Sequence, residues 1–188
     1  MKILFAVNNE NISEVIIKKY QQEYKEIITG KNVYYFNAIM KELQKDKSYD
    51  RVVISEDLEP FANNNFETMD KFIFDKLDNI SDEATNEQGE DIPIILICTD
   101  RRNKSDSILV KLFGIGVYNA LMGTDRSIEK VCGLINRPRT KKEAKIYYKV
   151  DSDEVNYESE SEESVSEEEI QNILIHYKNL GKNEDKYA

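Results

Sequence analysis

The chain has 188 residues, with 26 Lys and Arg against 36 Asp and Glu, and a formal net charge of −10. Ten of the acids, and no base, lie in the segment Asp151–Glu169. Outside this acidic segment the chain carries 26 acidic and 26 basic residues, so the net charge belongs to one stretch. With 40% hydrophobic residues, this length suits one domain with a real core plus an appendage.

Composition and patterning exclude several classes of protein. No apolar run approaches the roughly 18 residues of a membrane-spanning helix. The apolar start, Ile3–Val7, is shorter than the apolar region of about 7–15 residues in a signal peptide. Cys98 and Cys132 lie in apolar patterns outside any paired-cysteine motif, which predicts reduced core residues, and the single histidine, His176, argues against a histidine-based metal site or triad. We expect a cytoplasmic protein without membrane insertion, metal or cofactor.

In the first third of the chain, short apolar runs alternate with helical patterns. Continuous apolar runs are typical of strands buried on both faces, and recurrence at i, i+3, i+4 and i+7 is typical of helices. The predicted strands are Ile3–Val7, Glu26–Thr29 (a weak strand ending at Gly30) and Arg51–Ser55. The predicted helices are Ile12–Tyr20, with Asn11 or Ser13 as its cap, and Phe36–Leu43.

The same alternation continues to Pro138, which lies where the stop of the last helix is expected. The polar stretch Ser81–Asp91 is predicted to be a loop. The later predicted strands are Ile92–Thr99 and Val117–Met122. The later predicted helices are Phe66–Ile80, Ile108–Leu112 and Ile128–Ile135.

Five strand–helix units predict a flavodoxin-like (CheY-like) α/β domain over residues 1–137, with a five-stranded parallel sheet covered by helices on both faces. In such sheets the working surface lies outside the carboxyl ends of the strands. Four of these ends carry polar residues and define the region where a functional site is expected: Asn8–Glu10, Ser55–Asp57, Cys98–Asp100 and Met122–Thr124.

Taken together, these ends resemble the receiver domain of response regulators over about residues 1–136. Ile3–Glu10 is similar to the first strand of that family, where two acids normally hold Mg²⁺, and Thr99 matches its switch hydroxyl. Gly116–Thr124 resembles the fifth-strand segment. The chain departs from the family at its chemistry, because Asn8 and Asn9 stand at the acid positions, Gly123 at the lysine position and Thr124 at the proline position.

The phospho-acceptor position is ambiguous. Counting from Asp50 along the strand selects Ser55, counting back from Pro60 selects Glu56, and Asp57 serves only if the strand is two residues longer. A glutamate there would imitate a phosphorylated aspartate, whereas a serine would be inert. Without the acid pair and the lysine, the metal-borne charge neutralisation that supports phosphoryl transfer is missing. The resemblance therefore implies a pseudo-receiver that is not an enzyme; the alternative is a receiver phosphorylated in the Glu56/Asp57 region.

Within this group the chain looks most like the atypical receiver of tad-pilus localisation ATPases (the CpaE/TadZ type), although the sequence holds no Walker-type G-x-x-x-x-G-K-[ST] motif. The resemblance implies a module for protein–protein interaction, regulation or localisation, with a homodimer as the expected assembly. In receivers the fourth helix, fifth strand and fifth helix form the usual dimer face. Carried onto this sequence, that face comprises Lys111, Phe113, Tyr118, Arg126, Glu129 and Lys130.

Arg137–Lys149 is basic and contains two adjacent tyrosines, so a nucleic-acid-associated regulator is the alternative from another class. A different interpretation is that this segment runs back over the domain, with Ile146 and Tyr147 covering part of it. A third hypothesis is a nucleotide-binding domain, but no glycine-rich phosphate loop follows any predicted strand. The candidate nucleic-acid contacts are Arg137, Arg139, Lys141, Lys142 and Lys145.

The C-terminal part is predicted to be a linker followed by a helix. Residues 138–165 form the linker, basic and then acidic, and largely disordered because few apolar residues offset its ordering entropy. Ser166–Glu169 has the spacing of a capping box and begins an amphipathic helix over 166–181. Such a helix must dock on its own domain, on a partner, or on the next domain of a longer chain. Its apolar stripe is Ile170, Ile173, Leu174 and Tyr177.

Overall fold

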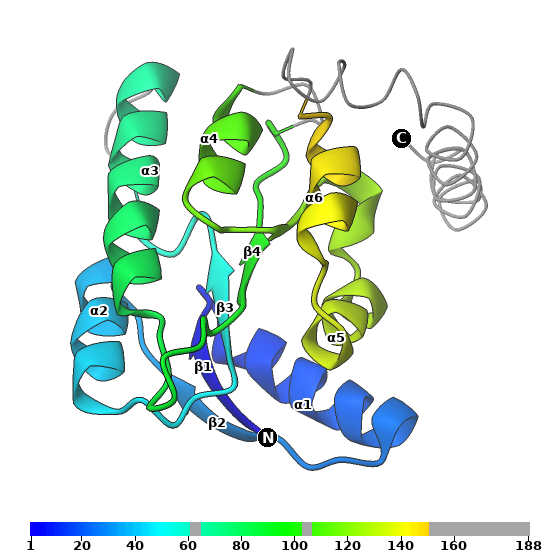
Figure 1. Ribbon diagram of the computed structural model, residues 1–188. Helices are drawn as coiled ribbons and strands as arrows, with labels where there is room; N and C mark the ends of the chain where they lie inside the picture. Colours follow the sequence, from blue (N-terminus) through cyan, green and yellow to red (C-terminus); the bar gives the residue numbers. More distant parts are fainter. Residues whose placement is uncertain (61–64, 103–106, 151–188) are drawn as a thin grey trace, which may run out of the picture.

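A sheet of five strands in the order β2-β1-β3-β4-β5 organises the computed structural model of the chain, which describes residues 1–60, 65–102 and 107–150 (Figure 1). All four strand pairings are parallel. This order and direction confirm the predicted flavodoxin-like α/β architecture. The predicted helix over 166–181 and the acidic segment lie outside the described residues.

The strands are β1 (Lys2–Ala6), β2 (Thr29–Asn32), β3 (Arg51–Ser55), β4 (Ile94–Ile97) and β5 (Asn119–Leu121). The helices are α1 (Glu10–Tyr24), α2 (Phe36–Lys45), α3 (Phe66–Glu83), α4 (Ile108–Gly114), α5 (Ile128–Asn136) and α6 (Lys141–Tyr148), with a short 3₁₀ helix, η1 (Gly123–Arg126), after β5. Within the described ranges, none of these helices is both long and apolar enough to cross a bilayer.

Side-chain alternation along the strands builds two cores. In β1, Leu4 and Ala6 point to one face of the sheet, and Ile3 and Phe5 point to the other. The first face packs against α2, α3 and α4, and the second packs against α1 and α5 (Figure 1). Both faces of the central strands are therefore buried, as their continuous apolar runs predict.

Two predicted features near the N-terminus are wrong. The cap of α1 is Asn9, whose side chain accepts a hydrogen bond from the backbone N–H of Asn11, so neither Asn11 nor Ser13 caps the helix. The second strand begins at Thr29 rather than ending there, because the Thr29 N–H makes the first bond to β1, to the Met1 carbonyl. Gly30 lies inside β2, where a Cβ would come within 2.9 Å of the Phe5 ring.

The linker predicted to start at residue 138 is also wrong in its first part, since Lys141–Tyr148 is helix α6. Thr140 and Glu143 form a capping box at its start: the Thr140 hydroxyl accepts from the Glu143 N–H, and the Glu143 carboxylate accepts from the Thr140 N–H. Ala144, Tyr147 and Tyr148 are buried. The segment does run back over the domain, with Tyr147 in the covering role and Ile146 only half-buried.

Helix α6 closes the open edge of the sheet at β5. The Tyr148 hydroxyl accepts a hydrogen bond from the Ala120 N–H (2.9 Å) and donates one to the Val117 carbonyl (2.7 Å). The Tyr147 hydroxyl accepts from the Met122 N–H at 3.2 Å. Arg139, just before α6, donates to the Ala120 carbonyl at 2.7 Å. Edge-strand groups that would otherwise be unpaired or open to another chain are thus satisfied by side chains.

Replacing Tyr148 by Phe tests this arrangement. The substitution keeps the buried ring but leaves a backbone donor and a backbone acceptor of the β5 segment without their partner. We expect the free energy of unfolding to fall by about 1–3 kcal/mol, measured by urea denaturation followed by circular dichroism. Tyr35→Phe, at an exposed tyrosine, is the matched control and should change it by less than about 0.5 kcal/mol. Equal effects of the two substitutions would contradict the role of the hydroxyl.

Candidate functional site

At the carboxyl edge of the sheet, the structure shows which of the residues predicted as acceptor positions is a buried acid. Ser55 is the last residue of β3, and the Glu56 N–H continues the ladder by donating to the Ile97 carbonyl at 2.9 Å. The Glu56 side chain then turns inward and keeps only 3% of its surface exposed, whereas Asp57 is exposed. Of the three candidate acceptor positions, Glu56 is therefore the one that places a carboxylate within the edge of the sheet.

Three donors converge on the Glu56 carboxylate. One oxygen accepts from the Thr99 backbone N–H at 2.9 Å and lies 3.5 Å from the Thr99 hydroxyl. The other accepts from Nε of Arg102 at 2.6 Å. Thr99, predicted as the switch hydroxyl, thus contacts the acid at the predicted acceptor position. Because both oxygens are occupied and buried, the charge of Glu56 is matched by donors rather than by water.

Arg102 joins Glu56 to a second acid, Asp70, on α3. The Arg102 side chain is almost fully buried, and its Nη1 donates to Asp70 at 3.0 Å, with a further bond from Nη2. Arg101 pairs with Asp70 at 2.5 Å and lies 4.6 Å above the Phe66 ring. Two carboxylates and two guanidinium groups therefore form one balanced network. Burial raises the pKa of Asp70, but the hydrogen bonds from Arg102 and Arg101 outweigh burial and hold that pKa below its ordinary value.

The asparagines that replace the acid pair are both engaged in local structure. Nδ2 of Asn8 donates to Asp57 at 3.0 Å, and Asn9 is the cap of α1. Two exposed acids lie near these uncharged amides: Asp57, which accepts from Asn8, and Glu10, which directly follows Asn9. Within residues 1–60, 65–102 and 107–150, no group of three or more His, Cys, Asp or Glu side chains has the arrangement of a metal site.

At the end of β5, an arginine supplies the positive charge that the resemblance to receivers assigns to a lysine. Gly123, at the lysine position, begins η1 with a positive φ of 56°. Arg126 folds back over this turn, donating to the Gly123 carbonyl at 2.8 Å and to the Cys98 carbonyl at 3.1 Å. It also pairs with Asp100. Arg126 therefore ties the ends of β4 and β5 together.

The predicted dimer face is partly covered by the chain itself. Helix α6 lies against α4, and the Phe113 ring of α4 stacks on the Tyr118 ring at 5.3 Å. Lys130 pairs with the buried Asp125 at 2.8 Å, and Arg126 is held as described above. Lys111 and Glu129 remain exposed. Helix α6 therefore covers only part of the predicted face, on its α4 side.

The five candidate nucleic-acid contacts do not form one surface. Arg139 is buried, donates to β5 carbonyls and lies 3.6 Å above the Tyr147 ring, so its inclusion in a nucleic-acid surface is wrong. Arg137 pairs with Glu143 at 2.9 Å. Lys145 lies 5.9 Å above the Phe113 ring, and Lys141 and Lys142 are exposed on α6. Three lysines of the predicted set thus lie together on α6, and Arg139 lies apart from them in the interior.

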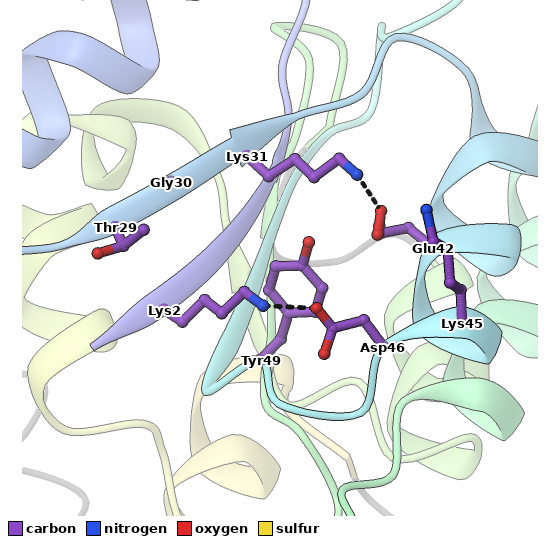
Figure 2. Close-up of a pocket in the computed structure, with 8 residues that line it drawn as sticks. All are labelled: Lys2, Thr29, Gly30, Lys31, Glu42, Lys45, Asp46 and Tyr49. Carbon is purple, nitrogen blue, oxygen red and sulfur yellow. Dashed lines mark hydrogen bonds and ion pairs between the residues drawn. The ribbon is translucent and has the colours of Figure 1, made fainter.

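Two of the hollows in the surface of the described domain lie beside charged side chains. One, of about 240 Å³, lies beside the charge network and is lined by Phe66, Asp70, Arg101, Arg102, Ser107 and Ile108. The other, of about 370 Å³, lies at the amino end of the sheet, near β2 and α2 (Figure 2). Figure 2 shows two ion pairs across it, Lys2–Asp46 (2.5 Å) and Lys31–Glu42 (2.6 Å), which tie the first two strands to the end of α2. These pairs neutralise one another and have a structural role.

Arg102 and Asp70 are the site residues that sequence reasoning missed. The loop holding Arg101 and Arg102 follows β4 at the carboxyl edge, which is a signal for the site, but only the fold shows that Arg102 turns inward. Asp70 gave no signal, because an acid on a helix is usually solvent-facing. Its place on α3 opposite the end of β3 gives it its role.

No protein-family model matches the chain, and no curated protein matches it either. Among solved structures it is similar to a Sinorhizobium meliloti 1021 protein described as a CpaE2 pilus assembly protein, with 14% identity and a TM-score of 0.50 over 73% of this chain and 98% of that one. A second structure, described as yeast Spc42 trimeric coiled-coil residues 181–211 in a fusion, gives 12% identity and a TM-score of 0.45 over 94% of each chain. The first likeness establishes the fold and agrees with the predicted resemblance to the CpaE/TadZ-type receiver.

The depressed pKa of Asp70 leads to a pH-dependent prediction. Asp70→Asn should lower the free energy of unfolding at pH 7 by about 1–2 kcal/mol, because hydrogen bonds to charged partners are lost. Since the folded pKa lies below the unfolded value of about 3.9, this advantage of the wild type is complete above about pH 5 and disappears as the pH falls below 4. Denaturation of both proteins across this range measures it. Asp75→Asn, an exposed acid on the same helix, should show no such pH-dependent difference.

Proposed function

We propose that the chain is a non-catalytic receiver-like domain of the cytoplasm that acts by binding other proteins, in regulation or in localisation. The observation that carries this proposal is the state of Glu56. Its carboxylate directly follows the last residue of β3, is buried, and accepts hydrogen bonds from Thr99 and Arg102.

Glu56 is poorly suited to act as a phosphoryl acceptor. A nucleophilic carboxylate needs a free oxygen in line with the donor, and the phosphoryl group needs a metal ion to neutralise its charge. Both Glu56 oxygens accept hydrogen bonds, and Asn8 and Asn9 bring no charge for a divalent cation. A carboxylate in contact with Thr99 instead imitates a phosphorylated aspartate, so we infer that the domain is held in one signalling state.

In the alternative function, a receiver that is phosphorylated, Asp57 is the better candidate for the acceptor. Its side chain is exposed, and it accepts a hydrogen bond from Asn8 on the neighbouring strand end. A small phosphoryl donor reaches Asp57 more readily than Glu56. A test of catalysis must therefore separate these two acids.

The class of partner that we infer is another protein, and both the fold of a structural neighbour and the covered β5 edge bear on it. The structural neighbour described as a pilus assembly protein supports a place in protein assembly or localisation, as an analogy of fold. A second copy of the chain stays a candidate partner. Its contact would run over α6 as well as α4 and α5, because α6 occupies the edge of β5.

Incubation with acetyl phosphate and Mg²⁺ tests the non-catalytic proposal. We expect no stoichiometric acid-labile phosphate, measured by intact mass at neutral pH, because the buried acid is inaccessible and the exposed acid lacks a metal site. A receiver with an intact acid pair serves as the positive control. Stoichiometric phosphorylation that disappears in Asp57→Asn or Glu56→Gln would refute the proposal and identify the acceptor.

A further inference from the structure

The sheet has a second edge strand, β2, whose outer side is not closed in the way that β5 is. β2 stands first in the strand order and, within the described sheet, pairs with β1 alone (Figure 1). The N–H groups of Thr29 and Val33 donate to β1 carbonyls, so the alternation of the ladder turns the backbone groups of Gly30 and Asn32 away from the sheet. Among the described residues, none forms a hydrogen bond with these outward groups. β2 can therefore accept a further strand.

Both faces of β2 are accessible where a further strand would approach. Thr29, Gly30 and Lys31 are all exposed, and successive side chains of a strand point to opposite faces of the sheet. Helices α1 and α2, which pack on the two faces, therefore stop short of this edge. A strand can be added here without moving a helix.

Large apolar side chains are exposed beyond both ends of this strand. Ile27, before β2, is 67% exposed, and Tyr35, after it, is 63% exposed. The chain still runs along β1 at Ile27, whose carbonyl accepts from the N-terminal ammonium at 3.3 Å, and Tyr35 has an extended backbone with φ of −141° and ψ of 146°. Each of the two residues lies four positions from Lys31, one on each side. The edge is thus self-complementary about Lys31.

We propose that a second copy of the chain binds at this edge, with the two β2 strands antiparallel about a two-fold axis beside Lys31. In this register Gly30 of each copy exchanges backbone hydrogen bonds with Asn32 of the other, so the outward groups of β2 find partners. Ile27 of each copy lies opposite Tyr35 of the other, and the two exposed apolar pairs cover one another. An axis at Gly30 or at Asn32 would instead move Ile27 away from Tyr35. The contact is isologous, as a closed dimer requires.

The charges beside the axis also suit a second copy. A lysine on an edge strand ordinarily discourages pairing, and this register places Lys31 opposite the Lys31 of the other copy. Each Lys31 is turned toward Glu42 of its own chain, however, and the two form an ion pair of 2.6 Å (Figure 2). The axis therefore gathers two cations together with two carboxylates and carries no net charge. A second copy brings its lysine already compensated, so like charge does not oppose the contact.

The contact that we propose is small and stands apart from the other surfaces. Because it rests on two short strands and two apolar pairs, we expect a Kd in the micromolar range, as for other small interfaces. β2 and β5 lie at opposite edges of the sheet, so the dimer leaves α4 and α6 of both copies accessible to other partners. The inference goes beyond the proposed function, and a monomeric chain would overturn the dimer without bearing on phosphorylation.

Sedimentation equilibrium of the full chain, from about 1 μM to about 1 mM, tests the dimer. We expect a reversible monomer–dimer equilibrium, and Ile27→Lys or Tyr35→Glu should each raise its Kd at least about tenfold, because each places a charge in an apolar pair. Val110→Glu, at a half-exposed apolar residue of α4, is the matched control and should leave the Kd unchanged. A monomer at every concentration would overturn the proposal and leave the edge to a strand of another protein. A dimer weakened by Val110→Glu alone would overturn it in favour of the α4 face.

Mixing the two weakened variants tests the register. In a mixed dimer of Ile27→Lys with Tyr35→Glu, the two new charges face one another at one end of the contact, and the other end keeps its natural pair. The mixture should therefore associate more tightly than either variant alone. A mixture of Ile27→Lys with Tyr35→Lys is the control and should stay weak, because two like charges then face one another. Equal behaviour of the two mixtures would overturn the proposed register.

Disulfide cross-linking gives an independent measure of the axis. Lys31→Cys places one thiol of each copy opposite the other, within the reach of a disulfide, so mild oxidation should join the two copies. Thr29→Cys, at an exposed residue of the same strand, is the matched control, because its two thiols would lie about 13 Å apart along the strands. The natural cysteines, Cys98 and Cys132, are both buried. Equal cross-linking of the two variants, or none from Lys31→Cys, would overturn the proposal.

Discussion

Glu56 is a carboxylate with 3% of its surface exposed, and a charge in that position is tolerated only where donors replace the water that it has lost. Those donors come from separate parts of the chain: Thr99 after β4 and Arg102 in the loop beyond it. Arg102 in turn requires Asp70 on α3. One buried charge thus couples the ends of two strands, a loop and a helix. The same hydrogen bonds that stabilise this edge of the sheet also occupy both oxygens of the Glu56 carboxylate.

A second constraint acts at the β5 edge of the sheet, where the backbone groups of an edge strand must not be left open to another chain. β5 is short and lies at the edge, and its outward backbone groups find partners in Tyr147, Tyr148 and Arg139 rather than in another strand. Side-chain donors and acceptors stop the sheet from growing. The helix that carries two of these side chains, α6, also lies against α4 and so covers part of the face that the resemblance to receivers predicts for association.

Much of the fold could be predicted because continuous apolar strands and i, i+3, i+4 helices leave few alternatives; β3 was predicted with its observed ends. The sequence could not show whether Ser55 or Glu56 lies at the end of the β3 ladder. The last bond of that ladder, from the Glu56 N–H to the Ile97 carbonyl, depends on the neighbouring strand. Helix α6 was missed because its buried residues are one alanine and two tyrosines among lysines. The Thr140–Glu143 capping box was its available signal. Arg102 and Asp70 are thirty-two positions apart, and no local pattern joins them.

Helix α6 also brings together two surfaces that the sequence presents as separate. The predicted dimer face contributes Phe113 and Tyr118, the basic segment contributes Lys145, and the lysine lies over the phenylalanine ring. A protein partner and a polyanion would consequently compete for the same place. The acidic segment begins directly after the half-buried Val150, at the edge of that place. Ten of the acids lie in that one segment and the rest of the chain is balanced, so the net charge of −10 is a property of the segment and not of the domain that carries both surfaces.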